Sequence, residues 1–464
     1  MAEPDTTTAA SPRDGLPTRQ RNAALVAILL SMALATLDSA ITNTALPTIG
    51  ADLGTDAETS IWVVSAYQIA MVAALLPLAS LADILGHKRI YIAGLVVFTV
   101  ASLACGLAWT LPLLAAARGI QGLGGAAIMS VNLALIRFIF PAAQLGRGAG
   151  INALVVALSF TVGPTVASAI LSVASWHWLF LINVPTGALA FFLGQRNLPV
   201  TATNGARFDG PAAVLTALTF SLFIFGLNAF GHGSGWPLVS AELVGSLICA
   251  AALLRRQRGH PAPMLAVDLF KLPVFALSSL TSICSFTTQG LAFVSLPFLL
   301  QIGLGHSQVE TGFLITPWPA MVAIMAPIAG RLSDRYPPGL LGGIGLAMLA
   351  TGMAAMASLP AAPDVPDLVW RLMLCGAGFG FFQSPNLRAL MSSAPPRRSG
   401  GASGIVATSR MVGQATGAAL VALCFELSQT RAPVLALWIG CGSAAIGCGA
   451  SFLRLVVAKK GPAA

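Results

Sequence analysis

Charge is what this sequence has least of. Only 9% of its 464 residues are charged, whereas a soluble globular protein carries roughly 25%. This scarcity excludes an ordinary water-soluble fold. The chain also lacks a GxxxxGK[ST] phosphate-binding loop and the HExxH and GxSxG patterns. ATP is therefore not indicated as a direct energy source, nor is a hydrolytic active site.

Metal-binding and disulfide patterns are missing as well. The seven cysteines are odd in number, show no CxxC spacing and fall in apolar stretches, so we expect neither a disulfide framework nor a metal site. The net charge of +9 comes from scattered basic residues without a basic and aromatic patch, which argues against nucleic-acid binding. We expect no cofactor.

Long apolar runs are abundant. A helix needs roughly 20 mostly apolar residues to cross a bilayer, and fourteen such runs follow one another along the chain. The sequence therefore predicts an all-α polytopic membrane protein with fourteen spans, at Ala23–Leu46, Ile61–Leu81, Ile90–Trp109, Leu111–Phe138, Ala149–Val173, Trp178–Gly194, Pro211–Phe230, Leu238–Leu254, Val274–Gln301, Gly312–Leu332, Leu340–Leu359, Leu368–Met391, Ala402–Leu427 and Val434–Leu455.

The loop charges predict an orientation. Basic residues recur in every second loop, as at Lys88 and at Arg331, and at the C-terminal membrane surface, as at Arg454, while the opposite loops carry acids such as Asp52 and Glu310. Cytoplasmic loops are enriched in Lys and Arg, so both termini are expected in the cytoplasm of a multi-pass protein of the inner (plasma) membrane.

The two ends of the chain resemble each other at an offset near 254 residues. Asn132-Leu133 recurs as Asn386-Leu387, and Gly163 corresponds to Gly417. An even number of spans separates the copies, so the repeats are parallel, as in transporters built from two six-helix halves. The predicted domains are a tail (1–22), a six-helix bundle (23–196), a linker with two additional helices (197–272), a second six-helix bundle (273–456) and a tail (457–464).

Five motifs in this order resemble the major facilitator superfamily, in particular its fourteen-span drug:proton antiporter branch. They lie at Leu37–Ile49, Pro77–Arg89, Arg118–Gly125, Gly163–Pro185 and Ser409–Gly417. The resemblance implies the major facilitator fold and a monomer in the lipid bilayer. It also implies a multidrug efflux function in which the proton gradient drives a small-molecule substrate outward. The loop motif departs from the family pattern at Ala79, Ile84 and His87.

One acid and one base are expected deep in the membrane. Asp38 and Arg118 both enter from the same predicted side, at matching depths, so a direct or water-bridged pair is plausible. An ionisable residue in hydrocarbon costs at least about 2.5 kcal/mol and usually serves a function. We interpret the pair as the proton-coupling site; the alternative is a static ion pair that fixes helix packing.

Other charges and one proline are weaker candidates. Arg410, about a turn and a half into its predicted span, either reaches the headgroups or faces the cavity, and Glu426 is either an interfacial acid or part of an outer vestibule. The resemblance implies a gating role for the loop charges and for the kink that a mid-helix proline introduces. These gating candidates are Asp83, Arg89, Asp334, Arg335, Gly163 and Pro164.

A polar stripe with neighbouring aromatic residues runs along the ninth predicted span. It predicts a surface of the substrate cavity, with helix packing through Ser and Thr as the alternative. The cavity candidates are Ser282, Gln289, Phe286 and Phe293, with Trp318 and Asn386 on later spans.

The leading functional prediction is a proton-coupled exporter of lipophilic or cationic drugs or antiseptics. A dedicated exporter of one endogenous metabolite, such as an antibiotic or siderophore, is the alternative on the same fold. A channel or a membrane enzyme is disfavoured, because the repeat favours a rocking fold and no catalytic constellation occurs.

Overall fold

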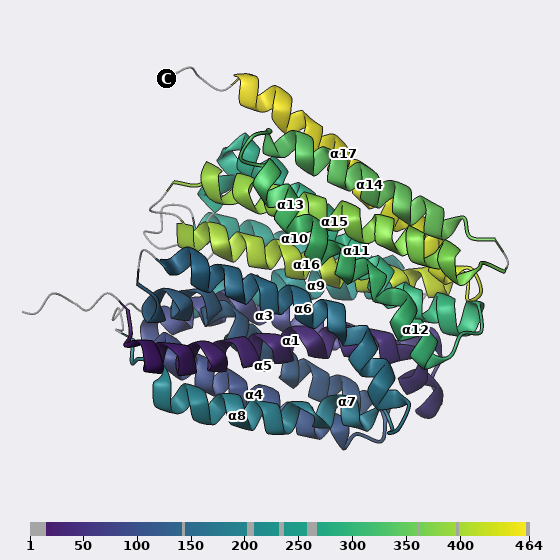
Figure 1. Ribbon diagram of the computed structural model, residues 1–464, viewed down its shortest axis with the longest axis horizontal. Coiled ribbons are helices and arrows are strands. Elements are labelled where there is room, and N and C mark those ends of the chain that lie inside the picture. Colours follow the sequence, from purple (N-terminus) through teal and green to yellow (C-terminus); the bar gives the residue numbers. More distant parts are fainter. Residues whose placement is uncertain are drawn as a thin grey trace, which may run out of the picture.

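The computed structural model describes residues 15–141, 144–201, 208–231, 236–257, 267–360, 362–395 and 399–460. These residues form helices and no strand. Most of the predicted N-terminal tail (1–14) and the end of the C-terminal tail (461–464) lie outside the described residues. The helices run alongside one another, with the first half of the chain and the second half forming two adjacent bundles (Figure 1).

The N-terminal half comprises eight helices. They are α1 (Thr18–Asp52), α2 (Ala57–Ser60), α3 (Trp62–Leu85), α4 (His87–Gly106), α5 (Leu111–Ile139), α6 (Leu145–Leu171), α7 (His177–Leu181) and α8 (Asn183–Asn197). Gly86, at a φ of 99°, ends α3 and lets α4 begin at the next residue, because a residue without a Cβ adopts this conformation readily.

The C-terminal half follows after two intervening helices, α9 (Gly210–Gly231) and α10 (Trp236–Gln257), and the short η2 (Val267–Lys271). It comprises α11 (Pro273–Phe298), η3 (Leu299–Gly303), α12 (Gln308–Ile315), α13 (Pro317–Leu332), α14 (Pro338–Ala357), α15 (Val365–Ser393), α16 (Ser399–Leu427) and α17 (Ala432–Lys460). A capping box between Ser307 and Glu310 starts α12.

Twelve helical stretches in the described part of the chain are long and apolar enough to cross a membrane, two fewer than the sequence predicts. The predicted spans Ala149–Val173 and Ala402–Leu427 are not among the twelve. Helices α6 and α16, of 27 and 29 residues, occupy these positions, and only described residues enter the count. The all-helical membrane architecture stands, with twelve candidate spans.

The helix boundaries follow the repeat seen in the sequence. Helices α5 and α15 have 29 residues each, and the same offset of about 254 residues relates α6 to α16. Close helix packing is repeated too. A Cβ on Gly163 would lie 2.5 Å from Ala40 of α1, and one on Gly417 would lie 2.6 Å from the carbonyl of Thr287 on α11. Only glycine allows either approach.

The halves meet tightly at one end of the molecule, which we call the Asp52 end after the last residue of α1; the opposite end is the Thr18 end. Thr165 of α6 hydrogen-bonds Thr316 at 2.8 Å, and Ser168 donates to the carbonyl of Gln308 at 3.0 Å. Gln301 donates to the carbonyl of Thr44 at 3.2 Å. These three bonds close the Asp52 end between the halves.

Candidate functional site

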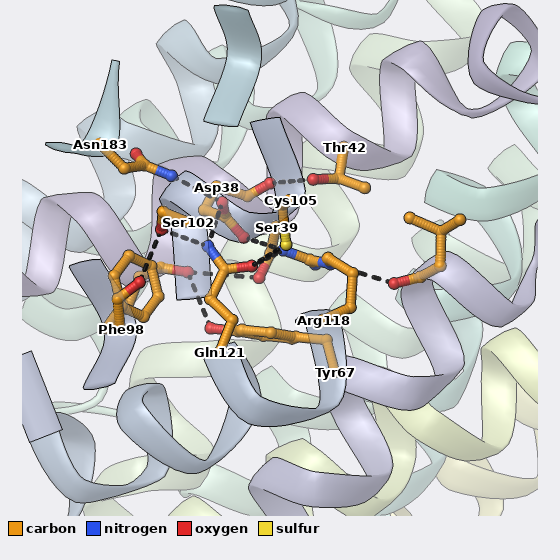
Figure 2. A network of polar contacts seen from close by, with 12 residues as sticks. Asp38, Ser39, Thr42, Tyr67, Phe98, Ser102, Cys105, Arg118, Gln121 and Asn183 are labelled. Carbon is orange, nitrogen blue, oxygen red and sulfur yellow. Dashed lines mark hydrogen bonds and ion pairs between the residues drawn. The ribbon is translucent and has the colours of Figure 1, made fainter. Parts of the chain in front are cut away.

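An acid and a base from different helices meet inside the N-terminal half. Asp38 of α1 and Arg118 of α5 are each only 1% exposed, and Nη1 of Arg118 donates to Oδ2 of Asp38. Figure 2 shows the two side chains pointing toward each other. The direct pairing that matching depths made plausible is present in the structure.

Neutral side chains complete the coordination of the carboxylate. Its second oxygen, Oδ1, accepts hydrogen bonds from Gln121 Nε2 at 2.9 Å and from Asn183 Nδ2 at 2.8 Å. Gln121 also accepts from Arg118 Nη1 at 2.5 Å and donates to Ser102 at 2.8 Å. A charge in a dry interior requires such partners, and both oxygens of Asp38 have them (Figure 2).

Arg118 has further partners of its own. Its Nε donates to the carbonyl of Val63 on α3 at 3.0 Å. Its guanidinium lies 4.3 Å from the ring centre of Tyr67 and 5.5 Å from that of Phe180. Aromatic faces attract a cation and exclude water at the same time. The pair is therefore held by helices α1, α3, α4, α5 and α8 together with α7.

The pair depends on the charges of both of its members. The attraction between buried charges repays their desolvation only while both are present and hydrogen-bonded. Protonating Asp38 would cancel its charge and leave Arg118 with the neutral acceptors Val63 O and Gln121 Oε1. The charge state of Asp38 thus decides how strongly α1 is held to α5.

The partners of the pair were not identified as site residues from the sequence. Gln121 lies three residues after Arg118, so the two share a helix face. Asn183 lies near the end of the motif Gly163–Pro185. These two positions could therefore have been found from the sequence. Ser102 and Tyr67 carry no such signal, because only the folded arrangement of α3 and α4 brings them to the pair.

The two acids among the gating candidates have side-chain partners outside that set. Asp83 contacts His87 at 3.3 Å rather than Arg89, which is exposed. Asp334 pairs with Arg388 rather than with its neighbour Arg335. Asp83 and His87 lie on either side of Gly86, where α3 ends and α4 begins, and Asp334 follows the end of α13 and reaches Arg388 of α15. Helix α6 continues through Pro164.

The two weaker charge candidates, Arg410 and Glu426, lie in different surroundings. Glu426 is exposed at the end of α16. Arg410 lies eleven residues after the first residue of α16, deeper than predicted, because the helix begins before the predicted span. Its guanidinium lies 5.5 Å from the ring centre of Phe160 on α6, so it points toward the other half and not to the headgroups.

Most of the predicted cavity residues are buried inside the C-terminal half. Phe286 packs against Phe379, and Phe293 packs against Trp318, which is fully enclosed. In this conformation these aromatic side chains belong to a hydrophobic core. Gln289 differs from these aromatic residues because its side chain is polar, and it accepts a hydrogen bond from Gln414 of α16 at 3.1 Å.

The remaining two cavity candidates belong to a second polar network. Asn386 donates to Ser282 at 2.8 Å and accepts from Arg454 at 2.6 Å. Arg454, expected at the membrane surface, is only 3% exposed and also donates to Ser278 and Ser451. Its partners are neutral.

Comparisons with known proteins agree with this architecture. The family model described as Major Facilitator Superfamily matches residues 28–418. The "Uncharacterized transporter YebQ" of Escherichia coli (strain K12) is 51% identical over 93% of this chain and 96% of its own length.

More distant relatives carry functional names. The "Riboflavin transporter RibZ" of Clostridioides difficile (strain 630) is 30% identical over 89% of this chain and 90% of its own length. The "Multidrug resistance protein Stp" of Mycobacterium tuberculosis (strain CDC 1551 / Oshkosh) is 31% identical over 89% and 77%.

Solved structures show the same fold at low identity. A POT family transporter in complex with a thioalcohol-conjugated peptide superposes with a TM-score of 0.71 at 15% identity, covering 95% of this chain and 96% of that one. The chain is an all-helical polytopic membrane protein with two repeated bundles, and the family model and the relatives match most of its length. It therefore belongs to the major facilitator superfamily of membrane transporters.

Proposed function

We propose that this protein is a proton-coupled secondary exporter that works by alternating access. The observation that carries the proposal is Asp38: a carboxylate 1% exposed in the middle of α1, bound to Arg118 and to two amides. Acids inside membrane helices mark proton pathways. No metal or cofactor is part of the proposal, since the proton gradient supplies the energy.

The proton would act by weakening the attachment between helices. With Asp38 ionised, α1 is held to α5 and α8 by charge-assisted hydrogen bonds, which are stronger than neutral ones. A proton on Asp38 removes the charge while Arg118 keeps its bonds to Val63 and Gln121. The N-terminal half then has two arrangements that differ in charge. One favours the inward-facing state of the transporter and the other favours the outward-facing state.

The closed Asp52 end supports this cycle. We propose that the Thr18 end faces the cytoplasm, with both termini there, and that the Asp52 end faces outward in an inner (plasma) membrane. The ionised pair then belongs to the inward-facing state, after the proton has left toward the cytoplasm. The proposal includes α6 and α16 as spans, giving the fourteen of the drug:proton antiporter branch, and places α9 and α10 outside the two six-helix bundles.

The loop charges complete the proposed cycle. Asp83 and Asp334 both pair within their own halves in this structure, so neither joins the halves at the Thr18 end. We propose that these acids, with Arg89 and Arg335, latch this end when the Asp52 end opens. Gly163 and Pro164 sit where α6 packs on α1 and near Gly312, at the contact that must separate.

The proposed cargo is a small lipophilic compound, moved outward against a proton moving in. The relatives named for multidrug resistance support a broad range of drugs or antiseptics. A second candidate, export of a single metabolite, is favoured by the relative named as a riboflavin transporter.

Transport into inverted membrane vesicles tests the proposal. With a proton gradient, vesicles containing the wild-type protein should accumulate at least one compound from a panel of dyes and antiseptics, and a protonophore should stop this accumulation. Vesicles with Asp38→Asn should equilibrate the same compound without concentrating it. Concentration by the Asp38→Asn variant at the wild-type rate would show that the proton is carried elsewhere.

A further inference from the structure

The middle of the interface between the halves carries an arginine. Arg410 is half-buried near the middle of α16, and its guanidinium faces Phe160, near the middle of α6 in the other half. Substrates of two-repeat transporters bind near the bilayer midplane, at the interface between the repeats. Arg410 therefore occupies the place where a substrate would contact both halves.

No carboxylate balances this cation in the part of the chain that the structure describes. Asp38 lies in the middle of α1, but both of its carboxylate oxygens already bind partners within the N-terminal half, so it does not pair with Arg410. A guanidinium has five N–H donors and no acceptor. The ring of Phe160 satisfies the face of Arg410 but none of these donors.

The residues around Arg410 add hydrogen bonding and aromatic area. Gln414 lies one turn further along the same face of α16 and is bound to Gln289 of α11 at 3.1 Å. In the N-terminal half, Tyr67 of α3 shares a packed cluster with Met411 and Ala415 of α16 and lies with its ring against Arg118. Together these groups present cationic and amide donors beside aromatic rings.

We infer that the substrate is an aromatic organic anion whose anionic group binds Arg410, and that the site disfavours the cationic drugs expected from the sequence. The inference rests on the proposed export function and names its substrate class. A carboxylate or sulfonate would form charge-assisted hydrogen bonds with the guanidinium. Its ring system would pack beside Phe160, with Gln289 and Gln414 able to bind ring carbonyls. A cation at the same place would be repelled by Arg410 in a medium of low dielectric.

Two dyes with the same three-ring skeleton and opposite charge test the inference. Fluorescein is an anion and rhodamine 123 a cation at neutral pH, and their binding to the purified full-length protein in detergent is measured by fluorescence anisotropy. We expect fluorescein to bind at least about tenfold more tightly, as a charge-assisted hydrogen bond to one arginine allows.

Substitutions assign the preference to Arg410. Arg410→Gln should weaken fluorescein binding about tenfold or more and reduce the discrimination against rhodamine 123, while Arg410→Lys should keep part of the preference. Arg431→Gln is the matched control, because it removes the same charge from an exposed residue between α16 and α17 and should leave both affinities unchanged. Tighter binding of rhodamine 123, no binding of fluorescein, or equal fluorescein affinities in Arg410→Gln and the wild type would overturn the inference.

Failure of the inference and failure of the exporter proposal give different results. If vesicles concentrate rhodamine 123 in a gradient-dependent and Asp38-dependent way but fluorescein does not bind, the exporter stands and the anionic class falls. If fluorescein binds through Arg410 but the proton gradient never drives its transport, the substrate class stands and the proton-coupled exporter falls.

Discussion

The two halves use matching helices to build two buried polar networks that differ in charge. In the N-terminal half, α1, α4, α5 and α8 surround an acid and a base. In the C-terminal half, the corresponding α11, α14, α15 and α17 surround Arg454 with neutral partners. The first network contains an acid, whereas the described residues that hydrogen-bond with Arg454 are all neutral.

The repeat shows where the difference arises. At the offset of about 254 residues, Ala292 stands in place of Asp38 and Cys375 in place of Gln121, and both are fully buried. At the same offset the fully buried Leu372 stands in place of Arg118, and its neighbour Arg371 pairs with Asp367 of its own helix and is partly exposed. The same fold therefore holds a deeply buried ion pair in one half and an ordinary i,i+4 pair near a helix end in the other. The fold by itself does not create the buried ion pair; the residues placed on it do.

The largest expected effect separates the two acids of this comparison. Asp38→Asn should abolish gradient-driven accumulation in inverted vesicles, where one proton moving across 100 mV is worth about 2.3 kcal/mol, or roughly fiftyfold in concentration. Asp367→Asn, its control in the other half, should retain accumulation, because its pair lies at a helix end. Equal losses in the two variants would mean that both halves carry protons or that neither does.

A smaller effect separates the two buried arginines. Arg118→Met leaves the charge of Asp38 unpaired and should lower the free energy of unfolding by about 3–5 kcal/mol. Arg454→Met leaves no opposite charge behind and should lower it by only about 1 kcal/mol for the lost hydrogen bonds. Thermal unfolding in detergent, followed by intrinsic fluorescence, measures both.

A double variant sharpens this result. Asp38→Asn combined with Arg118→Met removes both charges, so the pair should recover part of the stability that Arg118→Met alone loses. If the double variant is as unstable as the sum of the single variants, the two charges do not depend on each other and the interpretation of the network is wrong.

The contacts between the halves can be tested by cross-linking. Thr165→Cys with Thr316→Cys should form a disulfide under oxidation, because the hydroxyl oxygens are 2.8 Å apart and a disulfide requires Cα atoms within about 7 Å. The cross-link should stop transport, and reduction should restore it. The single variants under the same oxidation are the control. Unchanged transport by the cross-linked protein would show that the Asp52 end does not need to open.

The smallest expected effect compares two serines. Ser102→Ala removes a hydrogen bond from Gln121, the amide that holds both Asp38 and Arg118, and should cost about 1 kcal/mol and slow gradient-driven transport several-fold. Ser451→Ala removes a partner of Arg454 and should cost a similar free energy without slowing transport. Equal transport rates in the two variants would contradict a special role for the orientation of Asp38.

Part of the site was predictable because membrane helices obey simple rules. The apolar runs, the repeat and the loop charges depend on local sequence. Helix α5 begins at its predicted first residue and ends one residue beyond its predicted last one, so local composition fixes the bounds of this helix closely. Asp38 and Arg118 stood out because ionisable residues are rare in hydrocarbon. Their matching depths made a direct or water-bridged pair plausible, and the structure shows the direct one.

The cavity assignments stay predictions, because the sequence shows a polar stripe but not what covers it. Ser282 and Asn386 are predicted to line the substrate cavity, and in this structure they bind each other beside Arg454. Arg454 was expected at the surface, and the packing of α11, α15 and α17 encloses it. A polar stripe on a membrane helix is satisfied equally well by a cavity or by a neighbouring helix.

The sequence by itself determined the membrane-spanning helices, the repeat and the presence of one acid and one base at equal depth, because each follows from hydrophobicity and residue spacing along a single helix. The tertiary structure decided which side chains complete the pair, which network lacks an acid and where Arg410 points. These depend on contacts between helices far apart in the chain, where rotation of a helix about its axis moves a side chain from the core to the interface between the halves.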